Sequence, residues 1–174
     1  MLRFADAVFC FYFVSHIPIV LLVDLQALLP EEYFPKSVVA MKDDYCREFR
    51  DPMLMDPPGW YQSLILCTVF IKLPFTVFAL YGYLKGARQC PWLRIPSILY
   101  GCHVATMLIP VFGHTLTHDF SKGKFPGPRN MHERLVLIGM FSPHLLLPLW
   151  IMLDALFSSA FQQQGKQSQQ KKIK

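Results

Sequence analysis

The sequence predicts an all-α membrane protein in which four transmembrane helices with proline kinks surround an intramembrane pocket. Of the 174 residues, 53% are hydrophobic, and the mean hydropathy of +0.31 is high for a soluble domain. Most of the hydrophobic residues lie in four runs, each about as long as the ~20 residues with which a helix crosses ~30 Å of hydrocarbon. Backbone amides find no water there, so each run must be helical. The runs are Ala7–Leu29, Tyr61–Leu84, Trp92–Leu116 and Leu135–Phe157.

The first run could alternatively be a cleaved signal peptide. It is longer than the apolar core of such a peptide, and no small-x-small cleavage site follows it. A transmembrane helix is therefore favoured. We expect one membrane domain over residues 7–157 and a disordered basic tail over residues 158–174, because that tail is polar and has little to bury.

Proline occurs in every one of the four runs, as Pro18, Pro74, Pro110 and the pair Pro143 and Pro148. A proline removes one helical hydrogen bond and tends to kink the helix. Proline is also common in membrane helices in general. Its presence in all four runs nevertheless favours helices that splay apart and leave a cavity between them.

Polar side chains inside the runs mark where that cavity is expected. Ionisable groups in hydrocarbon are costly and usually face the bundle interior or water. Asp24 is also compatible with a second reading, a helix-end carboxylate satisfied at the interface, because it lies about 8 Å from the end of its run. The polar residues within the runs are His16, Asp24, Thr68, Lys72, Tyr100, His103, Thr106 and His144.

The segment between the first two runs is more than a spacer. It carries seven acidic residues and the stretch "DPMLMDPPGW" at residues 51–60, in which apolar residues are flanked by prolines. This pattern predicts a short helix over Val38–Phe49 and a stretch, Asp51–Trp60, that folds back over the end of the bundle. We expect Asp51 to be buried and hydrogen-bonded near the first helix.

Several other functions are disfavoured. The net charge of +5 is spread over loops and tail without a basic stripe, so no nucleic-acid partner is expected. The five cysteines are scattered without a CxxC pair, which is neither a disulfide framework nor a zinc site. His114 and His118 have a spacing that can share a metal on a helix, but no third ligand is evident, so we expect interfacial polar residues, no metal and no cofactor.

Four stretches resemble the EXPERA family of membrane proteins, in particular its sigma-2 receptor branch. They are "YFVSHIPIVLLVDLQALLP", "EFRDPMLMDPPGWY", "CPWLRIPSILYGCHVATMLIP" and "HERLVLIG", in family order along nearly the whole chain. The resemblance implies a homodimeric, multi-pass receptor of the endoplasmic reticulum membrane, with nuclear envelope and lysosome as further locations. Its pocket would open toward membrane lipids and bind cationic amphiphiles and sterols, both cholesterol and oxysterols. The implied roles are cholesterol homeostasis and lipid trafficking, with the Niemann–Pick type C cholesterol transporter as a protein partner.

The resemblance also implies a ligand site. Asp24 would pair with a ligand amine and Asp51 would support it, in keeping with the need of a desolvated carboxylate for a proton or a cation. The chain departs from the family at Thr68, Lys72, Met107 and His144, where the receptors have glutamate, glutamine, threonine and tyrosine. The full expected ligand-binding set is Asp24, Asp51, His16, Val23, Thr68, Lys72, Tyr100, Met107, Phe141 and His144.

Two other functions remain open. The family also includes a sterol double-bond isomerase, whose reaction passes through a carbocation and needs a placed acid and base. Asp24, Asp51, His16 and His103 could serve, but Lys72 in the pocket would oppose a carbocation, so we expect a receptor without catalytic residues. The third possibility is a scaffold that binds only other membrane proteins.

Lys72 is the residue that fits the family least. It lies near the middle of its run, where an ammonium costs on the order of 3 kcal/mol unless it is paired or neutralised. We hypothesise that Lys72 reaches toward Asp24 or Asp51 and acts as a built-in cation. The alternative is a neutral lysine hydrogen-bonded to backbone or water.

Charge counts do not orient the chain, because Lys and Arg divide eight to eight between the two sides that four helices define. The end of the chain is more informative. Lys172 and Lys171 are third and fourth from the C-terminus, as in the di-lysine retrieval signal that the cytosol reads on proteins of the endoplasmic reticulum. That reading places both termini in the cytosol, and the competing reading is an ordinary solvated basic tail.

If the tail is a retrieval signal, changing Lys171 and Lys172 to Ser should release the protein toward later secretory compartments. The measurement is the localisation of the tagged protein in cells by fluorescence microscopy. Unchanged reticular localisation would count against the signal.

Overall fold

A computed structural model describes residues 2–161 of the chain. Within them, four helical segments are long and apolar enough to span a membrane: Phe4–Ala27, Gly59–Lys85, Pro91–Thr117 and Met131–Phe157. Large apolar side chains such as Phe11 and Phe70 are 77% and 74% exposed on the outside of these segments. In a bilayer such side chains face lipid rather than water. The predicted all-α membrane fold with four spans is therefore confirmed.

The first span consists of helix α1 (Phe4–Leu22) and a 3-10 turn, η1 (Asp24–Ala27). Helix α1 contains Pro18 and begins at Phe4 rather than at Ala7, where the apolar run starts. The earlier start brings Asp6 into the helix, which is tolerated because Arg3 forms an ion pair with its carboxylate. At the other end, the helix narrows into the 3-10 turn just where Asp24 occurs.

The second span is interrupted by a π-helical turn. Helix α4 (Gly59–Cys67) passes through η3 (Thr68–Lys72) into helix α5 (Leu73–Lys85). At the junction the Leu73 amide donates to the carbonyl of Thr68, five residues back. Pro74 follows at once and has no amide hydrogen to donate, so the wider turn accommodates it. Single π turns inside α-helices are frequent at functional sites.

The third and fourth spans form a close pair. The third begins with a 3-10 turn, η5 (Pro91–Leu93), and continues as α6 (Arg94–Thr117), and the fourth is α7 (Met131–Phe157). A Cβ at Gly101 of α6 would lie 2.5 Å from Cβ of Met152 and 2.6 Å from the carbonyl oxygen of Pro148, both on α7. Only glycine permits so close an approach of the two backbones.

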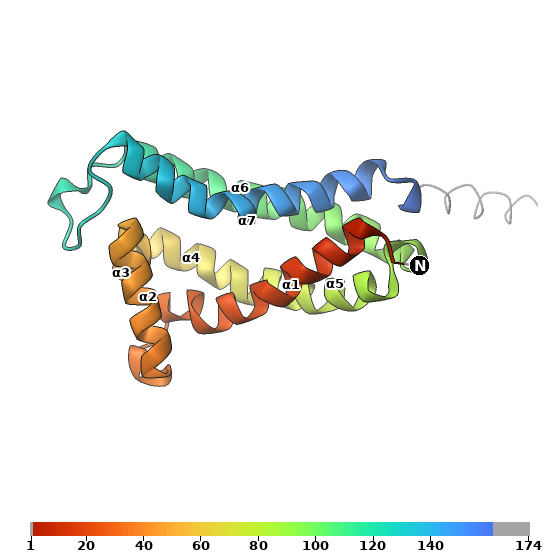
Figure 1. Cartoon of the computed structure of the whole chain (residues 1–174), viewed down its shortest axis with the longest axis horizontal. Coiled ribbons are helices and arrows are strands. Elements are labelled where there is room, and N and C mark those ends of the chain that lie inside the picture. The colour runs from red at the N-terminus through yellow and green to blue at the C-terminus, as the bar shows by residue number, and fades with distance from the viewer. Residues whose placement is uncertain (1, 162–174) are drawn as a thin grey trace, which may run out of the picture.

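Figure 1 shows two layers, with α6 and α7 in one and α1, α4 and α5 in the other, where α1 packs mainly on α5. The chain between the first two spans crosses one end of the bundle as η2 (Glu31–Tyr33), α2 (Lys36–Phe49) and α3 (Pro52–Met55). The predicted helix over Val38–Phe49 and the fold-back after it are thus confirmed. The connection from α6 to α7, with η6 (Phe120–Lys122), lies at the same end (Figure 1).

The opposite end holds the N-terminus, the end of α7 and the connection between α5 and α6 with η4 (Ala87–Gln89) (Figure 1). Of the predicted tail, residues 158–161 are described, and Phe161 is buried against the core at 3% exposure. Lys171 and Lys172 lie outside the described residues.

A network around Arg3 ties this end together. Its guanidinium lies 2.6 Å from the carboxylate of Asp6 and 2.8 Å from that of Asp154 on α7. It also donates to the hydroxyl of Ser158 at 2.7 Å. The Asp6 carboxylate accepts a further hydrogen bond from the Ala87 amide at 3.4 Å. One arginine therefore links α1, α7 and the turn after α5.

Replacing Arg3 by Ala should destabilise the protein by roughly 3–5 kcal/mol, the usual cost of removing one partner of a buried ion pair. The reason is that Asp6, only 1% exposed, would keep a buried charge without its cation. Thermal unfolding of purified protein in detergent measures the effect, and adding Asp6→Asn to Arg3→Ala should restore part of the lost stability. A matched control is Arg47→Ala at an exposed position of α2. Equal effects of Arg3→Ala and Arg47→Ala would contradict this account.

Candidate ligand-binding site

A cavity of about 370 Å³ is lined by residues from all four spans and from α2 and α3. The polar side chains of the wall come from several of these elements. The first span supplies His16 and Asp24, the π turn of the second supplies Thr68 and Lys72, and α3 is preceded by Asp51. Methionine, leucine and phenylalanine side chains from α6 and α7 complete a wall that is mostly apolar.

Nine of the ten residues expected at a ligand site line this one cavity. The residue that does not is Tyr100, whose hydroxyl lies 3.0 Å from that of Tyr12 and whose ring stacks on Phe75 with centroids 4.6 Å apart. A tyrosine satisfied in this way fills the aromatic core instead of facing the cavity. His103 and Thr106 of α6 are also absent from the wall. The nine that line it are Asp24, Asp51, His16, Val23, Thr68, Lys72, Met107, Phe141 and His144.

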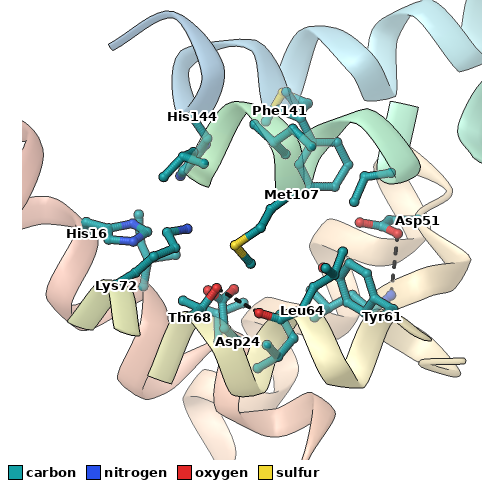
Figure 2. A pocket seen from close by; sticks show the side chains of 18 of the residues that line it. His16, Asp24, Asp51, Tyr61, Leu64, Thr68, Lys72, Met107, Phe141 and His144 are labelled. Carbon is teal, nitrogen blue, oxygen red and sulfur yellow. Dashed lines mark hydrogen bonds between the residues drawn. The ribbon is translucent and has the colours of Figure 1, made fainter. Parts of the chain in front are cut away.

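Asp24 lies where α1 passes into the 3-10 turn, and its side chain is half-buried. Asp24 and Thr68 both line the cavity (Figure 2). The Thr68 hydroxyl is already used, because it donates to the carbonyl of Leu64 at 3.1 Å. Among residues 2–161 no donor bonds the Asp24 carboxylate, so it is available to a ligand in the cavity.

Asp51 is the N-cap of α3 and is 1% exposed. Its Oδ1 accepts the amides of Met53 at 3.0 Å and Leu54 at 3.4 Å, so the residue both starts α3 and leaves Oδ2 for another donor. Burial raises the pKa of the Asp51 carboxyl to about 6, although the two amide hydrogen bonds oppose the shift. The predicted burial and hydrogen bonding of Asp51 are confirmed.

A second group of polar side chains in the cavity can donate hydrogen bonds and consists of Lys72, His16 and His144. Lys72 is 8% exposed and His16 is 2% exposed, and the ring centroids of His16 and His144 lie 6.0 Å apart. Figure 2 shows the Lys72 amine directed into the cavity on the side of these two rings. In the described part of the chain, Lys72 forms no ion pair within 4.0 Å with Asp24 or Asp51, so the hypothesised built-in cation does not directly neutralise either carboxylate.

The segment that folds back adds residues that the sequence reasoning did not select. Met41, Lys42 and Tyr45 of α2 line the cavity together with Tyr61 of α4. The Lys42 amine lies 3.0 Å from Glu31 and 3.5 Å from Asp43, so it is paired at the rim. The sequence did contain a signal for these residues, because α2 has a polar face and an apolar face. With the fold-back assumed, the apolar face would have been expected to turn toward the bundle.

His114 and His118, considered above for a metal, stack ring on ring with centroids 4.3 Å apart. Trp60 packs against His114 at 5.1 Å and Phe120 against His118 at 4.9 Å. The pair therefore belongs to an aromatic cluster at the end of the bundle, away from the cavity.

Comparison with known proteins gives a consistent picture. Residues 37–155 match the model of the EXPERA (EXPanded EBP superfamily) domain. The chain is 40% identical over 164 residues to Sigma intracellular receptor 2 of Xenopus tropicalis, covering 94% of this chain and 95% of the relative. It is 42% identical over 158 residues to the protein of that name from Homo sapiens, covering 89% of each. A more distant relative is Efficient mitochondria targeting-associated protein 19 of Schizosaccharomyces pombe, at 26% over 152 residues, or 86% of this chain and 73% of the relative.

The raised pKa of Asp51 predicts a pH dependence of stability. Its pKa is 3.8 ordinarily and about 6 in the folded protein, so the folded state is favoured by protonation. That contribution is complete below pH ~4 and is lost as pH rises through ~6. Between pH 5 and 7.5 the loss should be about 1.4 kcal/mol, from the roughly tenfold excess of protonated carboxyl at pH 5.

Asp51→Asn removes this titration while keeping a cap for α3, since asparagine is also a good N-cap. Thermal unfolding at pH 5 and 7.5 should show a smaller loss of stability with rising pH in Asp51→Asn than in the unchanged protein. Asp44→Asn, at an exposed position of α2, is the control. Identical pH dependence in Asp51→Asn and the unchanged protein would contradict the raised pKa.

Proposed function

This chain belongs to the EXPERA family of membrane proteins, and we propose that its cavity is the ligand site of a receptor for cationic amphiphiles and sterols. At the coarser level, the chain is a multi-pass membrane protein of the sigma-2 receptor type, given its four apolar spans and its similarity to Sigma intracellular receptor 2. The proposal adds the ligand class and the residues that bind it.

The observation that carries the proposal is the pair of carboxylates in one apolar cavity. Asp24 and Asp51 both line it, and the two amides that bond Asp51 use only one of its oxygens. A carboxylate in such surroundings gains most from a charged donor, because a charge-assisted hydrogen bond is stronger than a neutral one. The ammonium of an amphiphile would meet this need, and its apolar body would lie against side chains such as Phe141 and Met107.

The size of the cavity supports a small-molecule ligand. Its volume of about 370 Å³ falls in the range of ~300–1,000 Å³ that is usual for ligand pockets. A scaffold that bound only other membrane proteins would have no need of polar groups directed into an internal cavity. A sterol, with one hydroxyl on a rigid apolar body, suits the same combination of apolar wall and few polar groups.

An isomerase is the second candidate, and one feature disfavours it. Sterol double-bond isomerisation develops positive charge on the ring system, and an enzyme stabilises that charge with placed dipoles or anions. Lys72 lines the same cavity, and a positive charge there would raise the energy of a carbocation. We therefore favour binding over catalysis for this cavity.

The cellular setting is part of the same proposal. We place the receptor in the endoplasmic reticulum membrane with both termini in the cytosol, on the strength of the Lys171 and Lys172 pair in the sequence. A homodimer, a role in cholesterol homeostasis and lipid trafficking, and a contact with the Niemann–Pick type C cholesterol transporter complete the proposal by analogy with the family.

The direct test is equilibrium binding of a tritiated cationic amphiphile to purified protein in lipid nanodiscs, with cholesterol as competitor. Asp24→Asn should lower the affinity roughly 10- to 100-fold, the effect of losing a hydrogen bond between charged groups. Cholesterol should displace the amphiphile from the unchanged protein. Asp44→Asn, exposed and outside the cavity, is the matched control. Undiminished binding by Asp24→Asn would contradict the assignment.

A further inference from the structure

The two lysines of the cavity differ in their surroundings. The Lys42 amine is held by Glu31 at 3.0 Å and Asp43 at 3.5 Å. Lys72 is 8% exposed as a residue, and its amine projects from the π turn into the cavity (Figure 2). Among residues 2–161 the amine has neither an ion pair nor a hydrogen bond. A lysine held in an apolar wall without a protein partner is costly, so its partner is expected to come from the ligand.

Two histidines on the same wall, His16 and His144, also have ring nitrogens without a hydrogen-bond partner among residues 2–161. His16 is 2% exposed, and neither of its ring nitrogens has a hydrogen-bond partner in the described chain. The Nδ1 atom of His144 is likewise buried without a partner. Buried polar atoms are nearly always bonded in folded proteins. Three unsatisfied groups on one wall of one cavity therefore indicate a site for a group that accepts several hydrogen bonds.

The acidic side of the cavity is separate. Figure 2 shows Asp51 across the cavity from His16 and Lys72. No ion pair within 4.0 Å joins Asp24 to Lys72 in residues 2–161. The wall formed by Lys72, His16 and His144 thus keeps its donors for a ligand, while Asp24 and Asp51 keep their acceptors.

We propose that the wall of Lys72, His16 and His144 binds the carboxylate of an amphiphilic acid, such as a long-chain fatty acid or a sterol-derived carboxylic acid. A carboxylate has two acceptor oxygens and about four lone-pair sites, enough for an ammonium and two imidazoles. It also neutralises the lysine, which a sterol hydroxyl or a ketone does not. The remainder of the acid is apolar and suits the methionine, leucine and phenylalanine side chains of the wall. This inference shares with the proposed function the assumption that the cavity binds a small amphiphilic ligand.

One consequence separates this inference from amine binding. Amines and acids would occupy one cavity but depend on opposite charges in it. Removing the charge of Lys72 should weaken the binding of acids and strengthen the binding of amines. If Lys72 only held the helices together, replacing it would weaken the binding of acids and of amines alike.

The test is equilibrium binding to full-length protein in lipid nanodiscs, with empty nanodiscs as blank. The probes are palmitic acid and methyl palmitate, cholenic acid and its methyl ester, and hexadecylamine, whose ammonium group can donate hydrogen bonds. For the unchanged protein, at least one acid should bind about 10- to 100-fold more tightly than its own ester, as expected for hydrogen bonds to a charged group. The acid that shows this preference identifies the source, fatty acid or sterol.

Lys72→Gln should remove the preference for acid over ester and raise the affinity for hexadecylamine, whereas Lys72→Arg should keep most of the preference. Lys36→Gln, at an exposed position of α2 outside the cavity, should change neither. Equal binding of acid and ester by the unchanged protein would overturn the inference without the need of any variant. So would a preference that persists in Lys72→Gln.

The same experiment keeps the two proposals apart. If acids bind in a Lys72-dependent way and hexadecylamine does not bind at all, this inference stands and amine binding fails. If hexadecylamine binds through Asp24 and the acids show no preference over their esters, amine binding stands and this inference is overturned.

Discussion

The lack of water in the hydrocarbon core of a bilayer is the constraint on which this structure depends. A polar group in hydrocarbon must find a partner within the protein or face a cavity. At the end of the bundle that holds the N-terminus, partners are found: Arg3 binds Asp6 and Asp154 at 2.6 and 2.8 Å. At the other end, Asp24, Lys72 and His16 line a cavity instead. The end with the N-terminus is therefore tied together by a buried ion network, whereas His16 in the cavity has no hydrogen-bond partner among residues 2–161.

The π turn in the second span connects local geometry to the cavity. A regular α-helix through Thr68–Lys72 would have met the missing amide hydrogen of Pro74, and the wider turn avoids this conflict. Both ends of the turn, Thr68 and Lys72, line the cavity. From the sequence, Pro74 predicts only a kink. In the structure it follows a π turn whose two end residues, Thr68 and Lys72, face the same cavity.

The fold-back between the first two spans forms part of the cavity wall, and Asp51 lies where the chain reverses between α2 and α3. Arg50 ends α2 in the left-handed conformation with φ of 52°, and the next residue caps α3 through two amide hydrogen bonds. The reversal between the two helices brings Asp51 over the end of the first span. Its carboxylate therefore serves the local structure of α3 and the wall of the cavity at once.

The sequence alone determined the four spans, the fold-back and most of the cavity wall, because hydrophobic length and intramembrane polarity are local properties of the chain. His16, Asp24, Thr68, Lys72 and His144 could all be selected on this basis, with the family resemblance adding Val23, Met107 and Phe141. Tyr100 was selected by the same reasoning, but whether a polar group faces a cavity depends on its neighbours, and its hydroxyl lies beside that of Tyr12. Only the tertiary structure decided that Met41, Lys42 and Tyr45 join the wall and that, within residues 2–161, Lys42 forms ion pairs and Lys72 forms none. These outcomes depend on distances between side chains far apart in sequence, which helix packing fixes and hydropathy does not record.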